Sequence, residues 1–185
     1  SKLFFPHKKT PLFLEKGSGC YVYDIDGNKY IDLISGLLSV SLGYNIKEIN
    51  KKIIKQLNKG ITLSLPSLLE NKLAKKIINE IPSAEMVRFA KNGSDVTSAA
   101  IRLSRMITKR KIILTCGYHG WHEWYIGKTS MNAGIPNEMF INTKTFKYND
   151  IKSFEKVFKK NKPNIAAVIL EPMNVEWPNI KFLKK

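Results

Sequence analysis

The sequence predicts an α/β fold, in which an N-terminal arm of hairpin and helices precedes a layered sheet. Two observations support this prediction. Residues 19–34 place a tight turn between two β-prone runs, and residues 86–170 alternate short apolar runs with amphipathic segments. Such alternation is typical of a sheet covered by helices. We therefore expect the arm to span residues 1–63 and the sheet-containing domain to span residues 64–185.

The arm should begin with a hairpin centred on Asp26-Gly27-Asn28. Glycine accepts the positive φ that a tight turn requires, so this tripeptide between two β-prone runs indicates a hairpin. Residues 46–58 then carry apolar side chains at helical spacing between lysines, which predicts an amphipathic helix; these are Ile46, Ile49, Ile53 and Leu57.

A second helix is expected over residues 67–81, with Ser67 as its N-cap and Pro82 just past its end. The sheet domain should then continue as strand, helix, strand, helix, strand, over residues 86–90, 95–107, 111–115, 151–160 and 165–170. The last of these runs is continuously apolar, as expected for a strand that is covered on both faces.

The formal net charge of +16 raises the alternative of a basic nucleic-acid-binding protein. However, 27 of the 31 basic residues are lysines, and they are dispersed along the chain. Arginine, which is preferred for specific phosphate contacts, is scarce. We therefore expect solvated surface lysines and no nucleic-acid partner.

Other bulk features indicate a cytoplasmic protein without a membrane partner. No apolar run approaches the roughly 20 residues that a membrane span requires. Residues 1–6 lack the basic, apolar and small-residue regions of a signal peptide. Two distant cysteines, Cys20 and Cys116, form no disulfide framework. Cys116 follows an apolar run and should be a small buried residue.

The segment Lys91–Asp95 lies between an expected strand and an expected helix, and it is a candidate phosphate-binding turn. A helix N-terminus presents unpaired N–H groups and the positive end of the helix dipole. Gly93 allows the backbone to approach an anion closely, and Ser94 adds a hydroxyl donor. The alternative is structural, with Ser94 or Asp95 capping the helix.

A second turn, Gly117-Tyr118-His119-Gly120, follows the expected strand at 111–115. An aromatic side chain held there can stack on a planar ring. One alternative is a metal site, because Cys116, His119 and His122 have ligand-like spacing. Structural zinc usually takes four ligands, so we expect no metal. The other alternative is that the aromatic residues simply pack within a loop.

Glu171 ends the apolar run 165–170 and is the third candidate site residue. A carboxylate at that position must find a partner or shift its pKa. A helix cap and a surface ion pair are alternatives for this residue.

The three features occur in an order that resembles the class III, fold type I aminotransferases, which use pyridoxal 5'-phosphate (PLP). The similarity is greatest to the glutamate-1-semialdehyde aminomutase-like branch. It covers nearly the whole chain through residues 19–32, 85–105, 117–120 and 166–172. The resemblance implies that the arm is followed by the first part of the PLP-binding large domain.

The resemblance also implies the roles of five cofactor-binding residues. Gly93 and Ser94 correspond to the turn that binds the PLP phosphate. Tyr118 corresponds to a residue that lies against the pyridine ring, and Glu171 to an acid beside the cofactor. His119 belongs to the same motif and is a secondary site residue.

The family's chemistry is transfer of an amino group between an amino acid and a small aldehyde or ketone, in a homodimer. Asn92 before Gly93, and the residues around Gly36-Leu37-Leu38, depart from the family pattern. These departures argue against the aminomutase substrate. The turn at residues 92–95 and the segment at residues 118–121 instead resemble family members that act on a sugar or a small phosphorylated carbonyl. No lysine of this chain matches the Schiff-base lysine of the family. We therefore expect no transamination by these 185 residues alone; a non-catalytic remnant that keeps the fold is the alternative.

Overall fold

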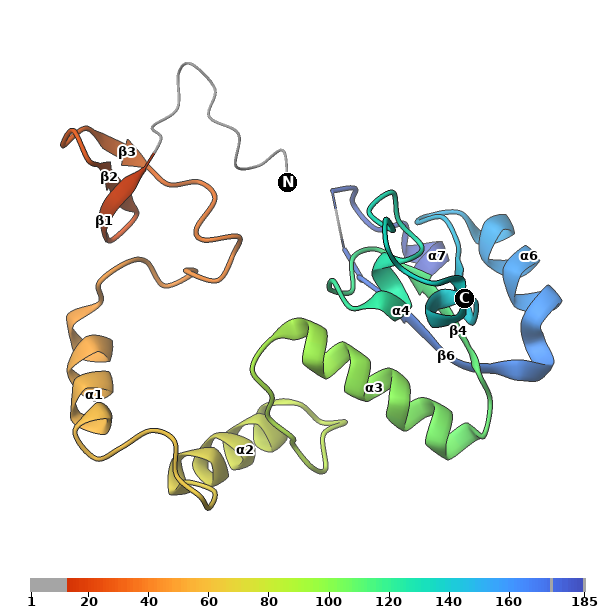
Figure 1. Ribbon diagram of the computed structural model, residues 1–185, viewed down its shortest axis with the longest axis horizontal. Helices are drawn as coiled ribbons and strands as arrows, with labels where there is room; N and C mark the ends of the chain where they lie inside the picture. The colour runs from red at the N-terminus through yellow and green to blue at the C-terminus, as the bar shows by residue number, and fades with distance from the viewer. Residues whose placement is uncertain (1–12, 174, 185) are drawn as a thin grey trace. The chain divides into compact units, whose positions relative to one another are not determined.

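The computed structural model describes residues 13–173 and 175–184 (Figure 1). Residues 1–6, where no signal peptide is expected, lie outside the described residues. The chain divides after Asn71 into two compact units. The domain boundary expected after residue 63 stays a prediction.

The first unit contains a three-stranded antiparallel sheet in the order β1-β2-β3. Strands β2 (Tyr21–Asp24) and β3 (Lys29–Ile31) confirm the hairpin, whereas β1 (Leu14–Ser18) was not predicted. The turn is built around the Asp24 carboxylate, which accepts four hydrogen bonds of 2.8–3.0 Å from Asp26, Asn28 and Tyr30. These bonds, that of the Asn28 side chain above all, hold the pKa of Asp24 below its usual range.

Two helices follow the sheet and confirm the expected ones. Helix α1 spans Lys47–Leu57, and α2 spans Leu68–Glu80. Ser67 caps α2 as predicted, because its Oγ accepts the N–H of Leu69 at 3.1 Å. In the described part of the chain, every helix is too short or too polar to span a bilayer.

The second unit is built on a parallel sheet in the order β5-β4-β6. Its strands are β4 (Ile112–Cys116), β5 (Thr143–Thr145) and β6 (Ile165–Leu170). Helices α3 (Gly93–Thr108) and α6 (Ile151–Asn161) lie on either side of β4 and β6 (Figure 1). Four short elements and β5 were not predicted; the four are α4 (Glu123–Ile126), α5 (Asn137–Phe140), the 3₁₀ helix η2 (Lys162–Asn164) and α7 (Ile180–Leu183).

The hydrophobic core of this unit lies between the sheet and helices α6 and α7. Its buried members are Leu114, Cys116, Phe146, Ile165 and Phe182. The apolar side of α6 packs against this cluster through Ile151, Phe154, Val157 and Phe158, as its helical spacing of apolar residues requires. The core also confirms the expected burial of Cys116.

Two expectations about strands were wrong. Residues 86–90 form no strand, and the Met86 side chain is 88% exposed. A strand is held by a neighbouring strand, and none of the described strands pairs with this segment. Similarly, β6 is not covered on both faces, because Val168 is 40% exposed. Among the described residues, β6 pairs with β4 alone.

Candidate functional site

Asn92 caps α3, rather than either of the two residues expected to do so. The Asn92 Oδ1 accepts the N–H of Asp95 at 3.1 Å, and the Asp95 carboxylate accepts the N–H of Asn92 at 3.2 Å. Together they form a capping box, in which Asp95 is the third helical residue. The Asn-x-x-Asp spacing was the sequence signal for this arrangement, and Ser94 takes no part in it.

This cap leaves the next two amides free to bind a ligand. In the part of the chain that the structure describes, the N–H groups of Gly93 and Ser94 donate no hydrogen bond to a protein acceptor. The first N–H groups of a helix lack partners within it and form the positive end of its dipole. A Cβ placed on Gly93 would meet nothing within 4 Å, so the space before these amides is open.

The Ser94 side chain is only 7% exposed. Its Oγ accepts the N–H of Trp121 at 3.1 Å, which leaves the hydroxyl hydrogen available for donation to a ligand. Gly120 makes this packing possible, because a Cβ there would overlap the Ser94 Oγ. The φ of Gly120 is also +102°, which disfavours any other residue.

A cavity of about 540 Å³ lies in front of these donors. It brings together four of the five predicted site residues, Gly93, Ser94, Tyr118 and His119. The full lining is Asn92, Gly93, Ser94, Thr97, Tyr118, His119, Gly120 and Trp121. None of these carries a carboxylate or an ammonium group. Tyr118 is 61% exposed, so its ring stands at the open side of the cavity.

Glu171, the fifth predicted site residue, does not line this cavity. Its Oε2 accepts the N–H of Tyr118 at 2.9 Å, and its own N–H donates to the Cys116 carbonyl at 3.2 Å. Gly117, with φ +92°, is required here because a Cβ would overlap the Glu171 carboxylate. Glu171 therefore fixes the backbone of Tyr118 across the carboxyl ends of β4 and β6.

His119 is buried, and its imidazole serves the packing of the turn. The Nε2 lies 3.0 Å from the Cys116 carbonyl, which can only accept, so Nε2 carries a proton. The ring stacks on Trp124 at 6.5 Å between centroids and meets Tyr125 edge to face. Burial lowers the pKa of His119, so the ring is neutral at neutral pH.

The residues considered for a metal have other partners. The His119 ring faces a carbonyl, and His122 Nδ1 lies 2.7 Å from the Ser98 Oγ. Within residues 13–173 and 175–184, no three His, Cys, Asp or Glu side chains gather as a ligand set.

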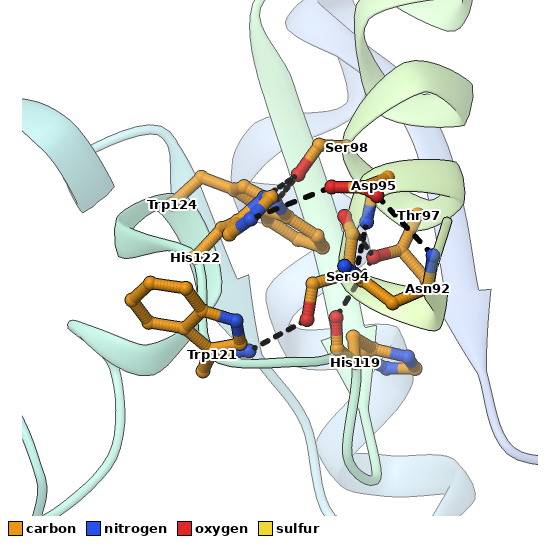
Figure 2. A network of polar contacts seen from close by, with 9 residues as sticks. All are labelled: Asn92, Ser94, Asp95, Thr97, Ser98, His119, Trp121, His122 and Trp124. Carbon is orange, nitrogen blue, oxygen red and sulfur yellow. Dashed lines mark hydrogen bonds and ion pairs between the residues drawn. The ribbon is translucent and has the colours of Figure 1, made fainter. Parts of the chain in front are cut away.

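Sequence reasoning missed a polar network that joins α3 to the second turn (Figure 2). Thr97 Oγ1 donates to the His119 carbonyl at 2.9 Å, and Ser98 bonds both His122 and Trp124. The helical spacing of Ser94, Thr97 and Ser98 was the available signal, because it places three hydroxyls on one face.

Comparison with known proteins shows similarity to PLP-dependent enzymes. The chain is 38% identical over 164 residues to a 3-aminobutyryl-CoA aminotransferase of Cloacimonas acidaminovorans, covering 88% of this chain and 39% of that protein. It is 39% identical over 176 residues to a glutamate-1-semialdehyde 2,1-aminomutase of Methanosphaera stadtmanae, covering 90% of this chain and 42% of that protein. The chain thus spans about two fifths of these relatives' length.

A solved structure agrees with these relatives. The fold matches the PLP internal aldimine form of the FumI protein from Sphingopyxis sp. MTA144 with a TM-score of 0.89 and 31% identity. That match covers 100% of this chain and 45% of the FumI chain. The profile of the family described as aminotransferase class-III matches residues 4–177. The chain therefore belongs to the class-III aminotransferase family.

Proposed function

We propose that this chain is the N-terminal part of a PLP-dependent aminotransferase or aminomutase and that it binds the phosphate of PLP at the start of α3. One observation carries the proposal: among the residues that the structure describes, no protein acceptor takes the N–H groups of Gly93 and Ser94, which lie beside an open cavity. The shared family and the PLP-bound relatives support it.

The donor set fits a phosphate group. Two backbone N–H groups and the Ser94 hydroxyl can donate to its oxygens, and the α3 dipole favours its negative charge. The cavity lining holds no carboxylate that would repel it. Tyr118 stands at the mouth of the same cavity, where an aromatic ring can stack on the cofactor's pyridine ring.

Bound PLP would supply an electron sink for the carbanion that amino transfer creates. The residues of this chain would hold and orient it: Gly93 and Ser94 at the phosphate, and Tyr118 at the ring. His119 would shape the cavity as a neutral side chain, and Glu171 would act through the Tyr118 backbone. The substrates would be an amino acid and a small aldehyde or ketone, including sugars and phosphorylated carbonyls.

No lysine of this chain matches the Schiff-base lysine of the family, so we infer that these 185 residues do not transaminate alone. We also infer that the full-length protein forms a homodimer, as the family resemblance implies. A cytoplasmic location is supported by two free thiols, Cys20 and Cys116.

Gly93→Pro is the sharpest test, because it removes one N–H donor while sparing the helix. Proline is well tolerated at the first helical position, and Asn92 already has the extended backbone (φ −145°, ψ 172°) that precedes a proline. Gly93→Ala is the matched control, since it keeps the N–H and meets no neighbour. Titration with PLP and with pyridoxal, which lacks the phosphate, measures the phosphate contribution.

We expect the chain to prefer PLP to pyridoxal, and Gly93→Pro to weaken PLP binding about tenfold. Pyridoxal binding and the Gly93→Ala variant should change little. Equal affinity of the unsubstituted chain for the two probes would contradict the phosphate site. Amino transfer by the isolated chain, assayed with PLP, an amino acid and a keto acid, would contradict only the inferred inactivity.

A further inference from the structure

Four residues in the first two turns of α3 contact the turn that carries Tyr118. Ser94, Asp95, Thr97 and Ser98 lie along one face of the helix, and each meets a residue between His119 and Trp124 (Figure 2). Ser94 and Thr97 meet backbone groups, whereas Ser98 meets two side chains. Ser98 is the last of the four along the helix. It contacts both His122 and Trp124, whereas each of the other three contacts one residue of the turn.

The donors and acceptors around Ser98 are complementary. The Trp124 Nε1–H can only donate, and it reaches the Ser98 Oγ at 2.9 Å. The Ser98 hydroxyl hydrogen is thereby free to donate to His122 Nδ1 at 2.7 Å. On the other edge of the same ring, His122 Nε2 lies 4.0 Å from Asp95 Oδ1. Asp95 is in turn half of the capping box.

A Ser98–His122–Asp95 set suggests a hydrolytic triad, but its geometry is unsuitable. The 4.0 Å between His122 Nε2 and Asp95 Oδ1 is too long for a hydrogen bond. In addition, the Ser98 oxygen already accepts the Trp124 N–H, which makes it a poorer nucleophile. The contacts instead form a chain from the helix cap to the aromatic turn.

We propose that Ser98, His122 and Trp124 are positioning residues, forming a latch that holds the Tyr118–Trp121 turn at a fixed place over the phosphate-binding end of α3. The inference rests on the proposed PLP site and adds a function for three residues that do not line its cavity. The latch fixes two things at once. It keeps the Trp121 N–H on the Ser94 Oγ, and it keeps Tyr118 at the mouth of the cavity.

Ser98→Ala tests the latch, because it removes both hydrogen bonds and little volume. Ser104→Ala is the matched control, since Ser104 lies on the same helix, is partly buried like Ser98, and its hydroxyl donates to the Ala100 carbonyl within the helix rather than to the turn. Two measurements are made on the full chain. Amide hydrogen exchange of residues 117–124 reports the turn directly, and PLP and pyridoxal titrations report the site.

We expect Ser98→Ala to speed exchange of the turn about tenfold and to weaken PLP binding about fivefold. Ser104→Ala should change neither the exchange rate of the turn nor the PLP affinity. Ser98→Thr keeps the hydroxyl, so both should stay close to those of the unsubstituted chain. Should Ser98→Ala not fold, Trp124→Phe removes one donor while keeping a stacked ring. If both single variants fold, the double variant should lose less PLP affinity than the sum of the two.

Unchanged exchange in Ser98→Ala would show that no latch exists. Faster exchange with unchanged PLP affinity would overturn the positioning role while leaving the phosphate site intact. If the unsubstituted chain itself fails to prefer PLP to pyridoxal, the proposed function fails, and the positioning role fails with it. The exchange data would still decide whether the latch exists as a structural device.

Discussion

Helices α1 and α6 have the same length and the same kind of sequence, yet they differ in what they bury. Each has 11 residues, with apolar side chains at helical spacing between lysines. The apolar side of α6 packs on the core of the parallel sheet. On α1, Ile53 and Leu57 are each 51% exposed. The apolar period therefore predicts the helix, whereas burial depends on a partner surface that the period does not specify.

The two helices also begin differently. Asp150 caps α6 by accepting the N–H of Ser153 at 2.9 Å. The N-cap of α1 is Ile46, whose side chain makes no capping hydrogen bond. Helix α6 is thus held by its cap and by partly buried side chains that pack on the core, whereas α1 has no side-chain cap and its Ile53 and Leu57 are half exposed.

Truncating one apolar side chain on each helix should give the largest difference between α1 and α6 in lost free energy of unfolding. Phe154→Ala in α6 removes a ring that packs edge to face on Phe146 at 5.2 Å. We expect it to lower the free energy of unfolding by about 3 kcal/mol. Ile53→Ala in α1 should cost less than about 1 kcal/mol, because its side chain is already half in water. Urea denaturation measures both; equal losses would mean that α1 is packed as well as α6.

Exchanging the caps should produce a smaller effect. Asp150→Ala should destabilise α6 by about 1 kcal/mol, and Asp150→Asn, which can still cap, should be near neutral. Conversely, Ile46→Asp should stabilise α1 by about 0.5 kcal/mol, since the new cap outweighs the lost contact of a half-buried isoleucine. Thermal denaturation followed by circular dichroism measures both. A destabilising Ile46→Asp would show that Ile46 contributes by packing.

The smallest expected difference is in how the stability of each unit responds to mild acid. The described residues 13–71 contain no histidine, so a histidine can contribute only in the second unit. In the second unit, burial lowers the pKa of His119, so the unfolded chain takes up a proton there more readily than the folded chain. This contribution is complete above the ordinary histidine pKa of about 6.5 and is lost as pH falls toward the lower folded value. Stability should therefore decline as pH falls below about 6.5.

His119→Gln is the control for that decline, since glutamine does not titrate. The difference in unfolding free energy between the chain and this variant should shrink as pH falls. A difference that stays constant with pH would mean that the His119 pKa is the same in the folded and unfolded chain.

Local patterns predicted the elements whose signals lie within a few residues. The turn at Gly27, the helix at 151–160 and the strand at 165–170 all belong to this group. The errors at 86–90 and the missed β5 have one physical cause. A strand is defined by a neighbour, and the neighbour is distant in sequence: Thr143–Thr145 is a strand because it pairs with β4.

The candidate site also combines features with a local sequence signal and features that depend on residues distant in sequence. The sequence pointed to four residues that the structure brings to one cavity, because glycines and hydroxyls before a helix have a local signature. For the network through Ser98 and Trp124, the helical spacing of the hydroxyls was the available signal, but it did not indicate their partners, since Trp124 lies 26 residues from Ser98. Glu171 was expected either to find a partner or to shift its pKa, and its carboxylate accepts a backbone N–H from a residue 53 positions away in sequence.

The close fit of Ser94 against Gly120 has a consequence for how this site can change by mutation. A side chain at position 120 faces two separate obstacles, the overlap with Ser94 Oγ and the backbone angle of +102°. Shortening residue 94 to glycine removes the overlapping Oγ and Cβ, but it leaves the Cα of residue 94 3.0 Å from the new Cβ and sacrifices the hydroxyl donor. The two positions are therefore epistatic, and a path of single substitutions that changes residue 94 first passes through forms that lack one donor of the proposed phosphate site.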